Sequence, residues 1–65
     1  MADIPTAASL SALTDQVDDL LRRVGDGAVA ADAGNAEGLA TALDDTERAL
    51  RSARRSLQRA ERTFS

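Results

Sequence analysis

Large apolar residues recur at intervals of three and four in the first part of the chain. They are Leu10, Leu13, Val17, Leu20 and Val24. This spacing puts them on one side of an α-helix, in the pattern of a heptad repeat. The first part of the chain is therefore predicted to be an amphipathic helix.

Residues that favour caps and turns mark the ends of this helix. The Thr6 hydroxyl can accept a hydrogen bond from a free backbone N–H of the first turn. Gly25 and Gly27 follow the last apolar position, where a residue that tolerates positive φ is common. We therefore predict a helix over about residues 6–24, followed by a connector over 25–35.

A second heptad pattern follows Asn35, which is a suitable N-cap, and predicts a helix over about residues 36–64. One seven-residue series of this helix is large and apolar: Leu43, Leu50, Leu57 and Phe64. A neighbouring series becomes small along the chain: Leu39, Thr46, Ala53 and Ala60. Small side chains let another backbone approach closely, so the pattern predicts coiled-coil-like packing along an alanine-rich seam.

The connector allows the two helices to pair as an antiparallel hairpin. One register places the apolar positions of the first helix opposite those of the second, with Leu20 opposite Leu43. In that register the first helix is about 28 Å long and the second about 43 Å long. The end of the second helix, with Leu57 and Phe64, is then unpaired and available to a partner.

These patterns predict one all-α domain over residues 1–65, a two-helix hairpin that self-association or a protein partner completes as a bundle. Of all residues 43% are hydrophobic, but 14 residues are alanine. A chain of this length buries little surface by itself, so a partner is expected. The predicted interface residues are Leu43, Leu50, Ala53, Leu57, Ala60 and Phe64.

Charge is divided unevenly along the chain. Residues 1–47 carry ten acids and two arginines, whereas residues 48–65 carry six arginines and Glu61. Heptad spacing places these arginines on the outer side of the second helix. Nucleic-acid binding through this arginine-rich helix is an alternative function, because clustered arginines contact phosphates. No aromatic residue lies among them to stack on bases, so we expect a solvated face and a protein partner.

Four carboxylates, those of Asp18, Asp19, Asp44 and Asp45, come to one height of the hairpin in the predicted register. Oxygen-rich clusters can bind divalent cations. However, each of these residues has an arginine three or four positions further on, which is the spacing of ordinary ion pairs on a helix surface. We therefore expect no metal site and no cofactor.

The chain lacks the side chains that most often act in catalysis. The chain has no His and no Cys, so it lacks the usual general base and the thiolate nucleophile. It also has no glycine-rich phosphate-binding motif. We expect a non-catalytic protein without a small-molecule substrate.

The start of the chain has no apolar leader, and no stretch reaches membrane-spanning length, so we expect a cytoplasmic protein that does not enter a membrane.

Parts of both helices resemble the small subunit of bacterial exonuclease VII, a short helical hairpin. An apolar pair, an apolar residue and a glycine in the first helix are similar: Leu20, Leu21, Val24 and Gly27. The similar positions of the second helix are Ala53, Leu57, Ala60, Glu61 and Phe64. This resemblance implies an accessory subunit of a larger enzyme.

The size and the hairpin pattern are also similar to those of the small subunits and co-chaperones of type III secretion needles, which a partner completes. Both roles are alternatives to the main expectation. That expectation is a non-catalytic assembly or adaptor protein that acts through protein–protein contacts.

Overall fold

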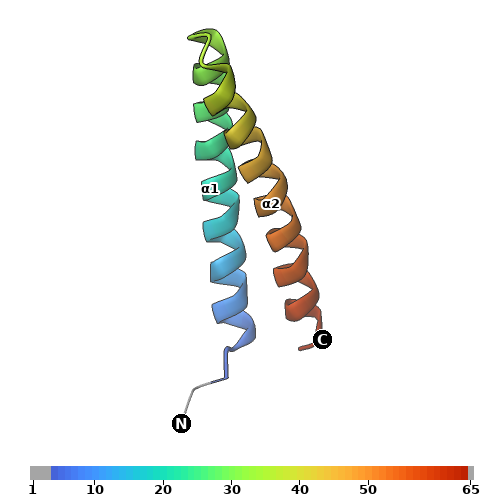
Figure 1. Ribbon diagram of the computed structural model, residues 1–65. Helices are drawn as coiled ribbons and strands as arrows, with labels where there is room; N and C mark the ends of the chain where they lie inside the picture. The colour runs from blue at the N-terminus through green and yellow to red at the C-terminus, as the bar shows by residue number, and fades with distance from the viewer. Residues whose placement is uncertain (1–3, 65) are drawn as a thin grey trace.

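The computed structural model describes residues 4–64, which form two α-helices joined by a short loop (Figure 1). Helix α1 is Ala7–Ala33 and helix α2 is Glu37–Arg62. They lie side by side and antiparallel, which confirms the predicted all-α hairpin. The molecule is elongated, with extents of 47 × 22 × 14 Å. Within residues 4–64, neither helix has a stretch long and apolar enough to cross a membrane.

Helix α1 begins where the sequence places its N-cap. The backbone of Thr6 is extended, and its hydroxyl oxygen accepts a hydrogen bond from the backbone N–H of Ser9 at 3.1 Å. This bond satisfies one of the backbone donors that a helix start leaves without an intrahelical partner. The prediction for Thr6 is confirmed.

Helix α1 is longer than the sequence pattern predicts. The helix predicted over residues 6–24 extends to Ala33, and most of the predicted connector over 25–35 is helical. Neither Gly25 nor Gly27 adopts a positive φ, so neither has the left-handed conformation that ends many helices. The predicted helix end was wrong because glycine permits a helix stop without requiring one.

Packing against α2 explains why the helix continues through these glycines. A glycine inside a helix costs about 1 kcal/mol relative to alanine. The turns that follow the glycines bury Ala28 and Ala31, each with 7% of its surface exposed. Burial of these turns and their backbone hydrogen bonds offset the cost of the two glycines.

The chain reverses direction at residues 34–36. The Ala36 N–H donates to the Ala31 carbonyl at 2.8 Å, and the Asn35 N–H donates to the Asp32 carbonyl at 3.1 Å, which is the Schellman arrangement. Asn35 has a φ of 60°, a left-handed conformation in which asparagine is enriched. Asn35 therefore ends α1 and is not the predicted N-cap of α2. The N-cap is Ala36, which makes no side-chain cap bond.

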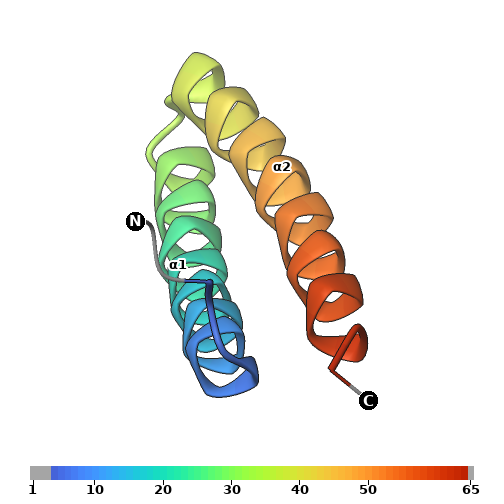
Figure 2. The same ribbon diagram turned by 90° about the horizontal axis from the view of Figure 1, so that it is seen from below.

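Small residues let the helices approach most closely near the loop. The buried apolar residues of the described chain are Ala28, Ala31 and Ala40, which all lie in the turns next to the loop. Two perpendicular views show the helices close together there and further apart toward their other ends (Figures 1 and 2). The alanine packing is thus concentrated at the loop end.

The register of the hairpin differs from the predicted one. An added Cβ at Gly27 would lie beside Leu43, and one at Gly25 beside Glu47, whereas the predicted register pairs Leu20 with Leu43. The short loop causes this shift, because residues close to it on both sides must meet. The two helices have 27 and 26 residues, so the predicted overhang of the second helix does not occur.

Candidate interaction surface

The two broad sides of the hairpin differ in chemistry. The side that we call the charged face consists of Asp18, Glu47, Arg51, Arg54 and Glu61. The side that we call the apolar face consists of Leu10, Leu13, Val17, Leu20 and Val24 of α1 with Leu39, Leu43, Leu50, Ala53, Leu57, Ala60 and Phe64 of α2. The line of contact between the helices separates the two faces.

Contacts between the helices show that both helices contribute to each face. Gly25 lies beside Glu47, and Gly27 lies beside Leu43. Each residue turns an α-helix by about 100°, so these two glycines flank the contact line on opposite sides. The side of Gly27 also carries, at seven-residue intervals, Leu13 and Leu20. The leucines of α1 and α2 therefore turn toward the same side of the hairpin.

Ion pairs hold the charged face together. A guanidinium nitrogen of Arg54 in α2 lies 2.9 Å from the carboxylate of Asp18 in α1. Within α2, Arg51 pairs with Glu47 at 2.8 Å, and only 17% of the Glu47 side chain is exposed. These carboxylates already have cationic partners within the hairpin. The charged face therefore needs no external partner to neutralise these two carboxylates.

Thr14 is a buried polar residue between the helices, with 8% of its surface exposed. Its hydroxyl lies 3.1 Å from the Leu10 carbonyl oxygen and 3.0 Å from the Glu61 carboxylate, and it can donate to either. Among residues 4–64, no buried side-chain nitrogen or oxygen lacks a hydrogen-bond partner. The contact between the helices therefore offers no free polar group to a ligand.

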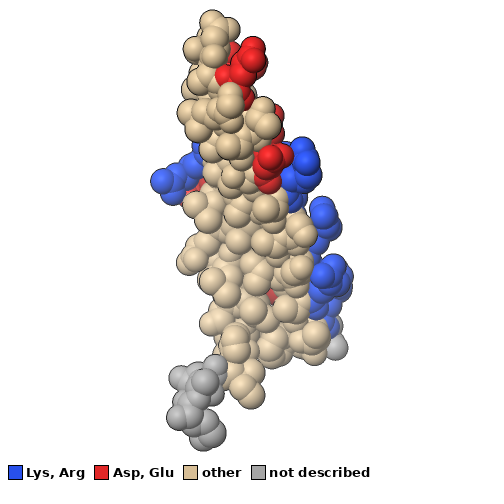
Figure 3. All heavy atoms as spheres, viewed as in Figure 1, with Lys and Arg blue, Asp and Glu red and all other residues tan. Residues whose placement is uncertain are grey.

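Part of the apolar face remains open to solvent. Leu13 and Leu20 are each 42% exposed, Leu39 is 55% exposed and Phe64 is 51% exposed. No large side chain within residues 4–64 is fully buried. Figure 3 looks onto this side: uncharged atoms of both helices form most of its centre, and charged side chains gather mainly at its edges. The hairpin by itself leaves an uncovered apolar layer.

All six predicted interface residues lie on the apolar face, but in different environments. Leu43, Leu50, Leu57 and Ala60 are partly buried, whereas Ala53 and Phe64 are exposed. The predicted reason for their availability, an unpaired end of the second helix, is wrong because α1 and α2 are nearly equal in length. What they share is the side of the hairpin that they face.

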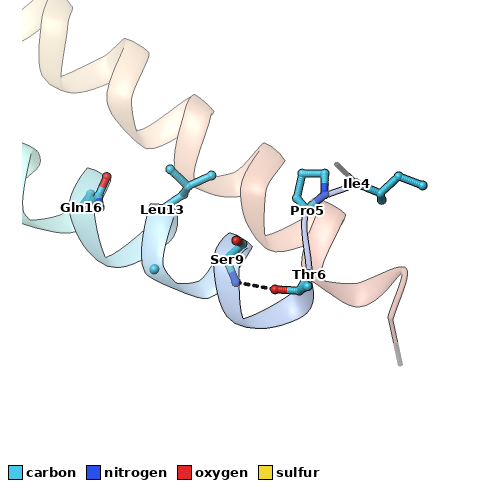
Figure 4. Close-up of a pocket in the computed structure, with 7 residues that line it drawn as sticks. Ile4, Pro5, Thr6, Ser9, Leu13 and Gln16 are labelled. Atoms are coloured by element: carbon cyan, nitrogen blue, oxygen red, sulfur yellow. Dashed lines mark hydrogen bonds between the residues drawn. The ribbon is translucent and has the colours of Figure 1, made fainter. Parts of the chain in front are cut away.

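A shallow groove extends the apolar area at the start of α1. Its lining residues are Ile4, Pro5, Thr6, Ser9, Ala12, Leu13 and Gln16. Figure 4 shows the Leu13 and Gln16 side chains and the Pro5 ring on one side of the helix, with the cap bond of Thr6 below them. Ile4 is 85% exposed. The groove joins the apolar face through Leu13.

The four carboxylates expected at one height of the hairpin do not converge. Asp18 faces Arg54 rather than Asp45, and Asp19 lies 3.7 Å from Arg23. In the part of the chain that the structure describes, no group of three or more ligating side chains could hold a metal ion. The changed register separates the aspartates that the predicted register had aligned.

Arginine side chains line the outer edge of α2, seen at the right of Figure 3. Arg59 donates to the hydroxyl of Ser56 at 3.1 Å. Arg55 and Arg62 form no ion pair with another residue of the range 4–64. This edge borders the apolar face near the open end of the hairpin and gives that end a positive charge.

The sequence interpretation missed the residues that determine the register. Glu47, Arg54 and Glu61 occupy every seventh position after Ala40 and form the other half of the α2 contact. Their signal in the sequence is a seven-residue series of alternating charge. Charged residues within a helix contact restrict its register, so this series predicts the pairing better than the leucines do.

Comparisons with known proteins found no similar family, protein or structure. No protein-family model matches the chain, and searches of curated proteins and of solved structures gave no match. The resemblances to the exonuclease VII small subunit and to secretion-needle subunits therefore stay predictions.

Proposed function

We propose that the chain is a non-catalytic assembly element that docks its apolar face against protein. The observation that carries this proposal is that residues 4–64 bury no large side chain fully, although the chain has eight leucines. Seven of the eight lie on the apolar face, and Leu13, Leu20 and Leu39 among them are more than 40% exposed. Apolar patches of this kind on small proteins mark interaction sites.

The shape and the chemistry of the face favour a helical partner. Two adjacent helices present leucines at intervals of three, four and seven residues, which is the pattern that packs against further helices in bundles. The arginines lie along its edge rather than on the face (Figure 3). This arrangement supports a protein occupant over a nucleic acid, whose phosphates would need the basic groups in the middle of the contact.

The non-catalytic part of the proposal is supported by the residues that the chain contains. It has no His and no Cys, so its serine and threonine hydroxyls have no imidazole to activate them. Asp18 and Glu47, on the charged face, are held in ion pairs with arginines. An enzymatic role would need groups that a partner supplies.

A cysteine-protection experiment in the native cells tests the docking role. The chain has no cysteine, so Leu20→Cys places a single thiol on the apolar face. Val29→Cys is the matched control, because Val29 lies on the same helix, outside the apolar face, and is 72% exposed. A membrane-permeant maleimide is applied to living cells, and the modified fraction is read by mass spectrometry.

We expect slow modification at position 20 and fast modification at position 29, because a docked protein covers only the apolar face. If the ratio of the two rates in cells equals the ratio measured for the unfolded chain, the face is not covered and the proposal is refuted. A photoactivatable crosslinker at position 20 then reports the mass of the occupant. A much larger chain there would favour the accessory-subunit role.

A further inference from the structure

We infer that the occupant of the apolar face is a second copy of this chain. The two hairpins stack antiparallel, with the loop end of one over the open end of the other, and together they form a four-helix bundle. This inference rests on the proposed docking role and names its partner. Four observations support it: surface area, the extent of the leucines, charge and shape.

The accessible surface of the hairpin matches what a dimer of this size needs. It measures 4780 Å², whereas a compact monomer of the same mass, 6.8 kDa, exposes about 4,000 Å². The excess of about 800 Å², taken over the whole chain, is comparable with the share that each partner contributes to a standard stable interface. One further hairpin is therefore sufficient to bury the excess.

The exposed leucines extend over the full length of the hairpin. Leu13 lies toward the open end, Leu20 near the middle of α1, and Leu39 next to the loop. A partner that covers all three must be about as long as the hairpin and must fill the space above both helices. A second hairpin meets both conditions, and Leu20 then lies close to the two-fold axis.

Charge determines the relative direction of the two copies. Residues 24–46, around the loop, contain five acidic residues and no arginine. At the open end, residues 4–13 carry no charged side chain, and residues 54–64 carry four arginines and Glu61. Antiparallel stacking brings the acidic end of each copy to the basic end of the other, whereas parallel stacking brings like charges together.

The shape of the hairpin favours the same direction. The helices are close together at the loop and further apart at the open end (Figures 1 and 2). In the antiparallel stack, the narrow alanine-rich end of one copy lies over the wide end of the other. The resulting dimer is isologous, which is the commonest symmetry of soluble homo-oligomers.

Sedimentation equilibrium of the purified full-length chain tests the second copy. We expect twice the chain mass of 6.8 kDa over a wide concentration range. Leu20→Lys is expected to raise the dimer dissociation constant about 100-fold or more, because each dimer would bury the new charge twice. Val29→Lys adds the same charge outside the face and is expected to leave the mass unchanged. Circular dichroism checks that both variants stay helical.

Three results would overturn the inference. The first is a wild-type chain that stays monomeric at all concentrations. The second is a dimer that Leu20→Lys leaves intact while the variant is folded, since the dimer would then use another face. The third is equal weakening by Val29→Lys. A monomer with a protected thiol at position 20 in cells would refute the second copy and keep the docking role, whereas a monomer with an unprotected thiol would refute both.

A distance measurement tests the direction. Ala33→Cys puts one spin label at the exposed loop end of α1 in a chain that has no other cysteine. In an antiparallel dimer the two labels are separated by about one helix length, about 40 Å, and electron spin resonance reads this distance directly. Adjacent labels would show parallel stacking and overturn the proposed orientation.

Discussion

Replacing Gly25 by alanine is the sharpest test of the long first helix. Gly25 lies inside α1 without a positive φ. The heavy atoms nearest to a Cβ added there are those of the Glu47 carboxyl group, at 3.8 Å or more. That is an ordinary van der Waals distance, so Gly25→Ala fits without displacing its neighbour.

The expected result is stabilisation. Alanine is favoured over glycine in a helix interior by about 0.5 to 1 kcal/mol, chiefly because the unfolded chain has less conformational freedom to lose. For a domain of this size, 1 kcal/mol raises Tm by about 4 to 8 °C. Far-UV circular dichroism measures the change at one fixed protein concentration, since the Tm of the proposed dimer would depend on concentration.

Gly38→Ala serves as the matched control. Gly38 lies in α2, which both the sequence pattern and the structure make helical, and nothing lies within 4 Å of an added Cβ. It is expected to raise Tm whether residue 25 is helical or not. A fall in Tm for Gly25→Ala beside a rise for Gly38→Ala would mean that residue 25 belongs to a connector, and the helix through residues 25–33 would be refuted.

Substitutions at three further places test local features. Asn35→Gly should stabilise the chain slightly and Asn35→Asp should destabilise it, because the site needs a left-handed φ; an N-cap would show the reverse order in urea unfolding. Thr6→Ala should lower the free energy of unfolding by about 1 kcal/mol through loss of the cap bond, with Thr6→Ser as the control that keeps it. A double-mutant cycle on Asp18 and Arg54 should give a coupling of about 0.5 kcal/mol, reduced by salt, because the side chains are 47% and 37% exposed; zero coupling at low salt would mean that the pair does not form.

Local chemistry made part of the fold predictable from the sequence. The two helices follow from the spacing of apolar residues. The start of α1 follows from Thr6, whose hydroxyl accepts a hydrogen bond from Ser9, three residues further on. Such features need no knowledge of the rest of the molecule. The antiparallel arrangement follows as well, because the predicted connector lets two helices that each have an apolar side bring those sides together.

The end of α1 and the register could not be predicted in the same way. Whether a helix stops at Gly25 depends on whether a second helix lies beside the following turns, and burial of Ala28 and Ala31 is a property of the folded hairpin. Asn35 fits either a cap or a left-handed turn, and only the tertiary arrangement selects between them. An error of nine residues in the helix end then moved every predicted cross-helix pair.

The position of the leucines relative to the contact line favours the proposed four-helix bundle. Half-buried leucines such as Leu21 and Leu50 line the contact between the helices, but Thr14, Glu47 and Arg54 lie there as well, so the contact does not take up all of the large apolar residues. Leu13 and Leu20 lie beside the contact, each 42% exposed. In a four-helix bundle every helix touches two neighbours, so its apolar stripe must be wider than one contact and must point between them. In α1 the apolar stripe extends from the half-buried Val17 to the exposed Leu20, which is wider than one helix contact requires and is what the proposed four-helix bundle needs.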